Sequence, residues 1–139
     1  MAQSIAGAIG QIQDLIGALT GVRAAPDQPV EKMSVLPLSL CYVGPGDWLN
    51  YVNGGKQFVG DIMVELHVPR KDLARDMSRL MGYVESVPNE IMSDPTLGGT
   101  VASVNGVRCN GISQINNADG TSTLALIWAV HVKMQNALT

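Results

Sequence analysis

The last long segment of the chain, residues 123–134, constrains the fold most strongly. Its apolar side chains recur at every second residue, which is the period of a half-buried β-strand. The apolar positions are Leu124, Leu126, Trp128, Val130, Val132 and Met134, and they alternate with Thr123, Ala125, Ala129, His131 and Lys133. Because this strand is long, we expect it to lie in the centre of a β-sheet.

Two further strands are predicted upstream, on either side of a turn-rich segment. Residues 34–43 place Leu36, Leu38, Leu40 and Tyr42 on one face, with Cys41 on the other. The following strand carries Phe58, Ile62, Val64, Leu66 and Val68 on one side and Asp61, Glu65 and His67 on the other. Pro37 lacks a backbone donor, so the first strand is expected to be an edge strand or to begin late.

The segment between these strands, residues 44–57, is predicted to form a long loop or hairpin arm. Gly44-Pro45-Gly46 is expected to end the first strand, and Asn53-Gly54-Gly55 supplies turn residues. The connection exceeds the usual hairpin loop, and long loops in compact domains tend to be functional or disordered. Trp48 and Tyr51 near its base favour a functional arm.

Two helices are predicted from apolar residues spaced three or four apart. The first carries Ile5, Ile9, Ile12, Ile16 and Leu19, with Ser4 as its cap and Gly21 as its stop. The second begins after Pro69 and carries Leu73, Met77, Leu80 and Val84. Its solvated face is expected to pair Asp72 with Arg75 and Asp76 with Arg79, and Pro88 is expected to interrupt it.

The C-terminal third is predicted to be β-structure. Asn105-Gly106 is expected to form a tight turn between strands 101–104 and 107–115, Asn110-Gly111 a bulge, and Ala118-Asp119-Gly120 another turn. The sequence therefore predicts a single α+β domain over residues 1–139. It has one mostly antiparallel sheet of four to five strands, with two helices packed on one face.

The composition favours a protein whose surface is partly covered by a partner. Charged residues make up 15% of the 139 residues, against about 25% in typical soluble domains. The net charge of −3 argues against a nucleic-acid footprint. The apolar N-terminus has no Lys or Arg before Thr20 and is interrupted by Gln11, Gln13 and Asp14. We therefore expect neither a signal peptide nor a membrane span.

No enzyme class has a motif in this sequence. His67 and His131 are predicted on outward strand faces, without the clustered Asp, Glu or Cys that a metal site needs. Cys41 and Cys109 lie outside any Cys-x-x-Cys pattern and are expected to be free thiols in a reducing compartment. We expect no catalytic residue, metal or cofactor. A cysteine nucleophile with a histidine base is an alternative that no motif supports.

One segment carries a resemblance to a known family. Asp94-Pro95-Thr96-Leu97-Gly98-Gly99-Thr100-Val101 follows an amphipathic helix and precedes the β-rich end. It resembles a stretch in the tail-terminator (tail-completion) and neck proteins of long-tailed phages, and the order of elements agrees over most of the chain. Within it, Pro95 restricts the backbone, and Gly98 and Gly99 permit conformations that other residues resist. Leu97 is expected to anchor into the core or into a neighbour.

The resemblance implies a structural protein that forms a ring, commonly a hexamer. Such a ring caps the finished tail tube and presents a surface to the head connector. The implied partners are further copies of the chain, the tail-tube protein and a head-completion or connector protein, in a virion assembled in the host cytoplasm. The candidate contact residues are Trp48, Tyr51, Asn53 and Gly54 in the arm, and Asp94, Pro95, Leu97, Gly98 and Gly99 in the resembling segment.

Two other classes of function stay open at the level of sequence. A different neck component or a tail-tube subunit shares small α+β or β-rich designs with the terminators. A small-molecule binding module would use the exposed sheet face that carries His67 and His131. A defined ligand pocket would favour that second alternative.

Overall fold

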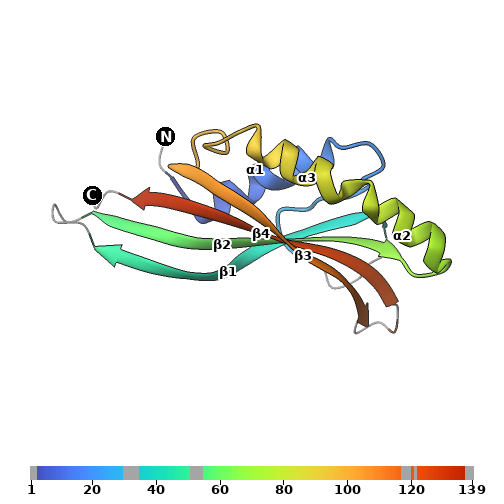
Figure 1. The fold of residues 1–139 in the computed structure, drawn as a ribbon. Helices are drawn as coiled ribbons and strands as arrows, with labels where there is room; N and C mark the ends of the chain where they lie inside the picture. The colour runs from blue at the N-terminus through green and yellow to red at the C-terminus, as the bar shows by residue number, and fades with distance from the viewer. Residues whose placement is uncertain (1–2, 30–34, 51–54, 117–119, 121, 137–139) are drawn as a thin grey trace.

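The computed structural model describes residues 3–29, 35–50, 55–116, 120 and 122–136. In chain order the elements are α1 (Ile5–Gly17), β1 (Leu38–Asn50), β2 (Lys56–Pro69), α2 (Leu73–Met81), α3 (Tyr83–Met92), β3 (Ser103–Asn116) and β4 (Ser122–Asn136). The strands form one antiparallel sheet in the order β1-β2-β4-β3, and the helices lie together on one side of it (Figure 1). The predicted α+β class is confirmed, with the second predicted helix bent into α2 and α3.

The two central strands, β2 and β4, hold the core together. Their register runs from Lys56 opposite Asn136 to Pro69 opposite Thr123. The apolar stripe predicted for β4 faces the helices, and Trp128 at its middle is completely buried. The predicted central position of this strand is confirmed. Pro37 also has the predicted effect, because β1 begins at Leu38 and is an edge strand.

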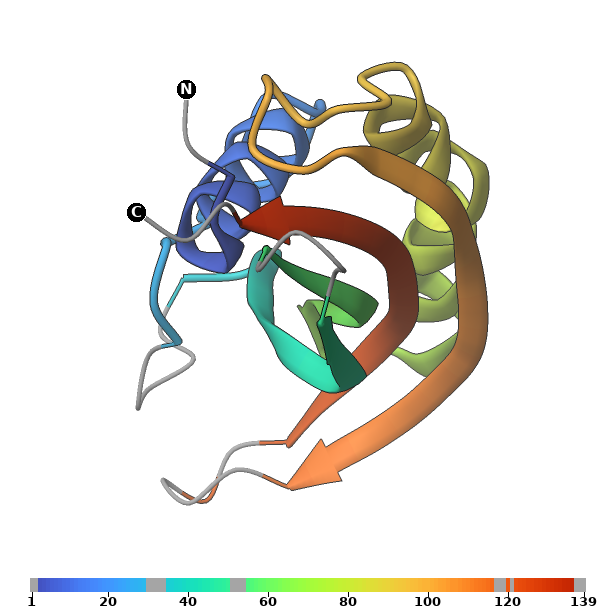
Figure 2. The same cartoon turned by 90° about the vertical axis from the view of Figure 1, so that its left-hand side faces the viewer.

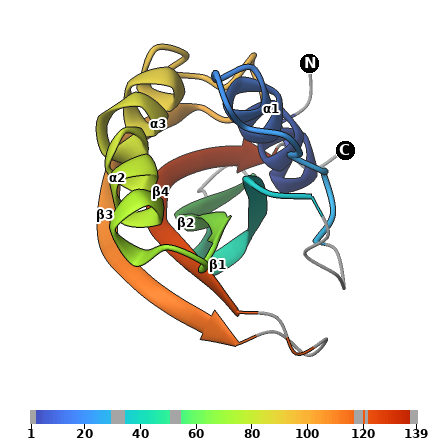
Figure 3. The same ribbon diagram turned by 90° about the vertical axis from the view of Figure 1, so that its right-hand side faces the viewer.

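The sheet face opposite the helices, here called the second face, is buried where β1 begins and more exposed toward Tyr42 and His131. The sheet twists and curls strongly (Figures 2 and 3), which brings side chains of neighbouring strands together on this face. The second face includes Leu38, Leu40 and Tyr42 of β1, Asp61, Met63, Glu65 and His67 of β2, and Ala125, Ala129 and His131 of β4. Leu38, Leu40, Ala125 and His67 are buried there.

Two predictions made from strand alternation are therefore wrong. His67 does share a face with His131, but it is 1% exposed and not on the surface. Cys41 faces the helices and belongs to the main core, whereas Leu38, Leu40 and Tyr42 face away from them. The alternation failed as a guide because the start of β1 is buried on both faces, so polarity no longer distinguishes inside from outside.

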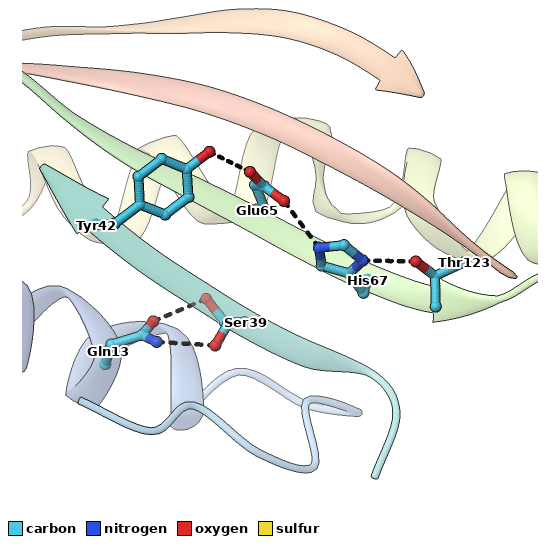
Figure 4. Close-up of polar contacts among 6 residues, drawn as sticks. All are labelled: Gln13, Ser39, Tyr42, Glu65, His67 and Thr123. Carbon is cyan, nitrogen blue, oxygen red and sulfur yellow. Dashed lines mark hydrogen bonds and ion pairs between the residues drawn. The ribbon is translucent and has the colours of Figure 1, made fainter. Parts of the chain in front are cut away.

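Helix α1 begins at the predicted cap and packs as predicted. The Ser4 hydroxyl accepts a hydrogen bond of 2.9 Å from the Gly7 amide, and Ile12 and Ile16 are fully buried. Gln13 lies on the same buried side. Its Nε2 donates to the carbonyl oxygens of Pro26 (2.7 Å) and Ser39 (2.8 Å), and its Oε1 accepts from the Ser39 hydroxyl at 2.8 Å (Figure 4). One buried amide thus ties α1 to the start of β1.

Pro88 does not interrupt the second helix, contrary to prediction. It lies inside α3, and the bend falls at Gly82 between α2 and α3. Proline inside a helix costs about 3 kcal/mol, whereas burying a large aliphatic side chain contributes about 1.5–3 kcal/mol. Val87 and Ile91, on either side of Pro88, are both fully buried. Their combined burial outweighs the cost of the proline.

The charged face predicted for α2 also differs in the structure. Asp72 caps the helix, since its carboxylate accepts from the Arg75 amide at 3.3 Å. Asp76, expected in solvent, is completely buried, and its Oδ2 accepts from the amides of Lys71 (2.9 Å) and Asp72 (3.0 Å). Leu73, expected in the apolar stripe, is 51% exposed. Asp76 accepts hydrogen bonds from backbone amides at the start of the helix. The spacing of Asp and Arg residues in the sequence does not reveal this role.

Gly44-Pro45-Gly46 and Asn105-Gly106 were both predicted to interrupt strands, and both predictions are wrong. β1 continues through the first with a register shift between Val43 and Gly46, and β3 continues through the second with a shift between Val104 and Gly106. Both are bulges in edge strands. Because an edge strand pairs with only one neighbour, the extra residue disturbs the hydrogen bonds to that neighbour and to no other strand. The bulge predicted at Asn110-Gly111 is confirmed by a shift there and a Gly111 φ of 92°. Ala118 and Asp119 lie outside the described residues.

Replacing Gln13 with alanine is expected to destabilise the fold by about 3 kcal/mol. The change removes both donors from the Pro26 and Ser39 carbonyls and leaves the Ser39 hydroxyl without its acceptor in a buried place. Urea unfolding measures the loss, and Gln28→Ala, at an exposed loop position, is the matched control. Equal stability of the two variants would contradict the structural role of Gln13.

Candidate functional site

The candidate site is the hairpin arm, defined as residues 44–50 of β1 and 56–60 of β2. Beyond the bulge the arm is paired as a ladder: Gly46 lies opposite Gly60, Trp48 opposite Phe58 and Asn50 opposite Lys56. The predicted long loop is therefore mostly strand. Of the predicted arm residues, Trp48 lies in this ladder, whereas Tyr51, Asn53 and Gly54 lie outside the described residues.

Apolar side chains are exposed along the arm. Trp48 is 52% exposed and Leu49 is 50% exposed, on opposite faces of the strand. The Trp48 ring packs on Phe58 with ring centroids 5.2 Å apart, and Phe58 itself is buried. One side of the Trp48 ring therefore packs against Phe58, and the rest of its surface is exposed to solvent. A rigid, half-exposed tryptophan is the kind of side chain that anchors protein interfaces.

Glycines set the geometry at the base of the arm. A Cβ at Gly60 would lie 2.5 Å from the Gly46 Cα and 2.8 Å from the Pro45 carbonyl oxygen. A Cβ at Gly46 would lie 2.5 Å from the Phe58 ring. The two strands therefore approach more closely here than any side chain allows, and the bulge at residues 43–46 sets the direction in which the arm leaves the sheet.

A chain of polar side chains fixes the arm base on the second face (Figure 4). Thr123 Oγ1 lies 2.7 Å from His67 Nδ1, and His67 Nε2 lies 2.9 Å from Glu65 Oε1. The Tyr42 hydroxyl then donates to Glu65 Oε2. The chain crosses β4, β2 and β1 and ends on the last residues before the bulge. On the helix face, Gln13 holds Ser39 of the same strand.

These contacts shift the acidities of the groups involved. The hydrogen bond from His67 lowers the pKa of Glu65 below its ordinary value of 4.5, against the opposing effect of burial. Burial, together with the hydrogen bond and charge of Glu65, raises the pKa of Tyr42 to about 12. Glu65 is thus held as a carboxylate and Tyr42 as a neutral donor, so the link between them persists at neutral pH.

Thr123, His67 and Glu65 follow one another as hydroxyl, imidazole and carboxylate, the order found in a catalytic triad. They differ from a triad in their accessibility to a substrate. Thr123 is 0% exposed and His67 is 1% exposed, so no substrate reaches the hydroxyl in this conformation. Burial raises the pKa of the Cys41 thiol to about 12, which removes it as a nucleophile near neutral pH. The geometry therefore favours a structural role for this chain of contacts.

The resembling segment, residues 94–101, forms an internal junction. Leu97 is completely buried in the core, with a φ of 47°, and Gly98 and Gly99 follow with φ of 65° and 86°. The backbone of the segment bonds to two other elements: Thr100 O accepts from the Ser4 amide at 3.1 Å, and Pro95 O accepts from the Val104 amide at 2.8 Å.

A side-chain contact also holds the junction, which lies in a different part of the fold from the arm. Asp94 Oδ2 accepts from Gln11 Nε2 of α1 at 3.2 Å. Of the two positions predicted for Leu97, the structure places it in the core. The segment connects α3 to β3, whereas the arm is formed by β1 and β2. The structure thus divides the candidate residues into a folding junction and an exposed arm.

A shallow groove lies beside the exposed histidine. It has a volume of about 390 Å³, and its lining includes Asp61, Asn105, Arg108 and His131. His131 Nδ1 lies 2.9 Å from Asp61 Oδ1. Within the described ranges, no group of three His, Cys, Asp or Glu residues is placed to hold a metal ion. In the same part of the chain, no helix is long and apolar enough to span a membrane.

No protein-family model matches the chain, and no curated protein matches it significantly.

Gly60→Ala is expected to lower the free energy of unfolding by about 2 kcal/mol or more, because its Cβ meets backbone atoms that cannot move aside. Gly106→Ala is the control, since a Cβ there has no atom within 4 Å and lies in the same sheet. Chemical unfolding of both variants measures the difference. A Gly60→Ala protein as stable as the control would mean that the strands do not approach closely here.

Glu65 is expected to contribute stability that depends on pH. Its pKa is lowered in the folded state, so its contribution is fully present above about pH 4.5 and is lost as the pH falls further. The difference in unfolding free energy between the wild type and Glu65→Gln should therefore shrink as the pH is lowered below that value. Urea unfolding from about pH 3 to about pH 7 measures it. A difference that stays constant over this range would contradict the lowered pKa.

Proposed function

We propose that this chain is a structural virion-assembly protein: a ring-forming tail terminator at the head-proximal end of a phage tail. The observation that carries the proposal is the strand-paired hairpin arm with its exposed Trp48 and Leu49. An arm of this kind, held at its base from both sheet faces, is suited to contact a neighbouring subunit. The partners are further copies of the chain, commonly six in a ring, together with the tail-tube protein and a head-completion or connector protein.

Two further observations support an assembly role. Large apolar side chains outside the arm are also exposed, including Leu73 and Met81 on α2. The charged fraction of 15% is low, so burial of these surfaces between subunits removes few charges from water. The segment at residues 94–101 supports the family resemblance but acts as a junction, so the arm is the part of the proposed site that faces outward.

Binding to tail tubes tests the proposal. Added to purified tubes that lack a terminator, the protein is expected to form one ring at one end and to block further elongation, as seen by negative-stain electron microscopy. Binding along the length of the tube, or growth of the protein into open tubes of its own, would instead indicate a tail-tube subunit. Failure to bind either end of the tube would overturn the proposal.

The small-molecule alternative rests on the groove beside His131. The lining of the groove includes Arg108 as well as the hydrogen-bonded Asp61–His131 pair. Thermal stabilisation by a small organic acid, lost in Arg108→Ala, would favour this alternative over an assembly role.

Trp48→Ala is expected to leave a folded protein that assembles poorly. The substitution removes the exposed side chain that makes the contact, and the only core side chain that it uncovers is the ring of Phe58. Met92→Ala is the matched control, since Met92 is 54% exposed and lies at the end of α3, away from the arm. Light scattering across a concentration series measures assembly, and circular dichroism measures folding. Normal assembly by Trp48→Ala would exclude the arm as a contact.

A further inference from the structure

A cleft lies between the connection from α1 to β1 and the junction of α2 with α3. Its volume is about 420 Å³, and it is lined by Gly21, Arg23, Leu36, Pro37, Arg79 and Tyr83. An adjoining cleft of about 410 Å³ shares Arg79 and Tyr83. Two guanidinium groups beside an apolar wall fit a ligand that carries a carboxylate next to an apolar body.

Neither arginine of the cleft forms an ion pair among the described residues. The ion pairs there join His67 to Glu65, Arg75 to Asp76 and His131 to Asp61. Against the effect of burial, the backbone hydrogen bonds from Lys71 and Asp72, with the charges of Arg75 and Arg79, lower the pKa of the buried Asp76. Arg79 therefore acts on this carboxylate without forming an ion pair with it. Two cations that share one cleft repel each other, and a bound carboxylate would relieve this repulsion.

The cleft is held in shape by contacts behind it. The Tyr83 hydroxyl donates to the Thr20 carbonyl oxygen at 2.8 Å, which joins α3 to the α1–β1 connection. The Arg23 amide donates to the Pro37 carbonyl oxygen at 2.9 Å, which fixes the opposite wall. A ligand would therefore meet a largely preformed site and lose little free energy in ordering it.

The hairpin arm presents the complementary chemistry. Asp47, Trp48 and Leu49 are all exposed, and strand alternation places Asp47 and Leu49 on one face and Trp48 on the other. A carboxylate therefore stands beside an apolar side chain on the Asp47 face. Among the described residues Asp47 has no ion-pair partner. We propose that the arginine cleft of one copy binds the Asp47–Leu49 segment of the arm of a second copy. This inference rests on the proposed assembly function and names the contact that would build the ring.

The position of the two surfaces fits such a contact. The end of β1 and the start of β2 lie at one end of the molecule, and α2 lies at the other (Figure 1). An interface between two different surfaces of the same chain is heterologous, so it propagates from copy to copy. It gives a ring where the rotation closes and a filament where it does not.

A charge-reversal experiment tests the contact. Arg79→Glu places a carboxylate opposite Asp47 and is expected to weaken self-association about tenfold or more, as measured by light scattering over a concentration series. Adding Asp47→Arg to the same chain should restore association to within about threefold of the wild type. Arg70→Glu, an exposed arginine outside the cleft, is the control and should have little effect. Circular dichroism checks folding, and Arg23→Glu provides an independent variant should Arg79→Glu be unstable.

The outcomes separate this inference from the proposed function. Rings that are lost in Arg79→Glu and restored in the double variant support both. Open filaments with the same charge dependence support the contact and overturn the terminator function. Rings that tolerate both Arg79→Glu and Arg23→Glu overturn the contact and leave the function standing. A wild type that stays monomeric at every concentration overturns the contact, while binding to the end of a tail tube still tests the function.

Discussion

The antiparallel pairing of β2 with β4 is the constraint on which the rest of the structure depends. The pairing runs without a register shift from one end of the two strands to the other, and β4 is buried on both faces over residues 123–126 and 128–130. On the helix face Trp128 lies in the core, and on the second face Ala125 and His67 are buried. The bulges occur only in the outer strands β1 and β3. The central strands β2 and β4 thus fix the register of the sheet, and the bulges lie in the edge strands.

The same arrangement explains how an exposed arm is held rigid. β1 gains its order from β2 on one side, from Gln13 on the helix face and from the Tyr42–Glu65–His67–Thr123 chain on the second face. Beyond the bulge these supports end, and Trp48 and Leu49 are exposed on a strand that remains paired. An arm ordered in advance binds with a smaller loss of conformational entropy than a loop that must fold on contact. This is the physical basis of the proposed assembly role.

Much of the fold could be predicted from the sequence because periodicity and burial agree in α1, β2 and β4. Ser4 as a cap and β4 as a central strand are examples that the structure confirms. The errors lie where a local signal competes with tertiary packing. Pro88 is kept inside a helix by buried neighbours, and Asn105-Gly106 forms a bulge although it has turn residues. The polar chain through His67 joins residues far apart in sequence, so only the spacing of Glu65 and His67 on one strand face hinted at it.

The outer surface of Trp48 is expected to become buried between subunits, and the fluorescence emission of this residue reports on that burial. The chain has two tryptophans, of which Trp128 is fully buried and Trp48 is half exposed, so a change in solvent quenching on assembly reports on Trp48. The measurement is iodide quenching of tryptophan fluorescence at increasing protein concentration, with Trp48→Phe as the background. Quenching is expected to fall, and the emission to shift to shorter wavelength, as the assembled species forms. Assembly with unchanged quenching of Trp48 would contradict it.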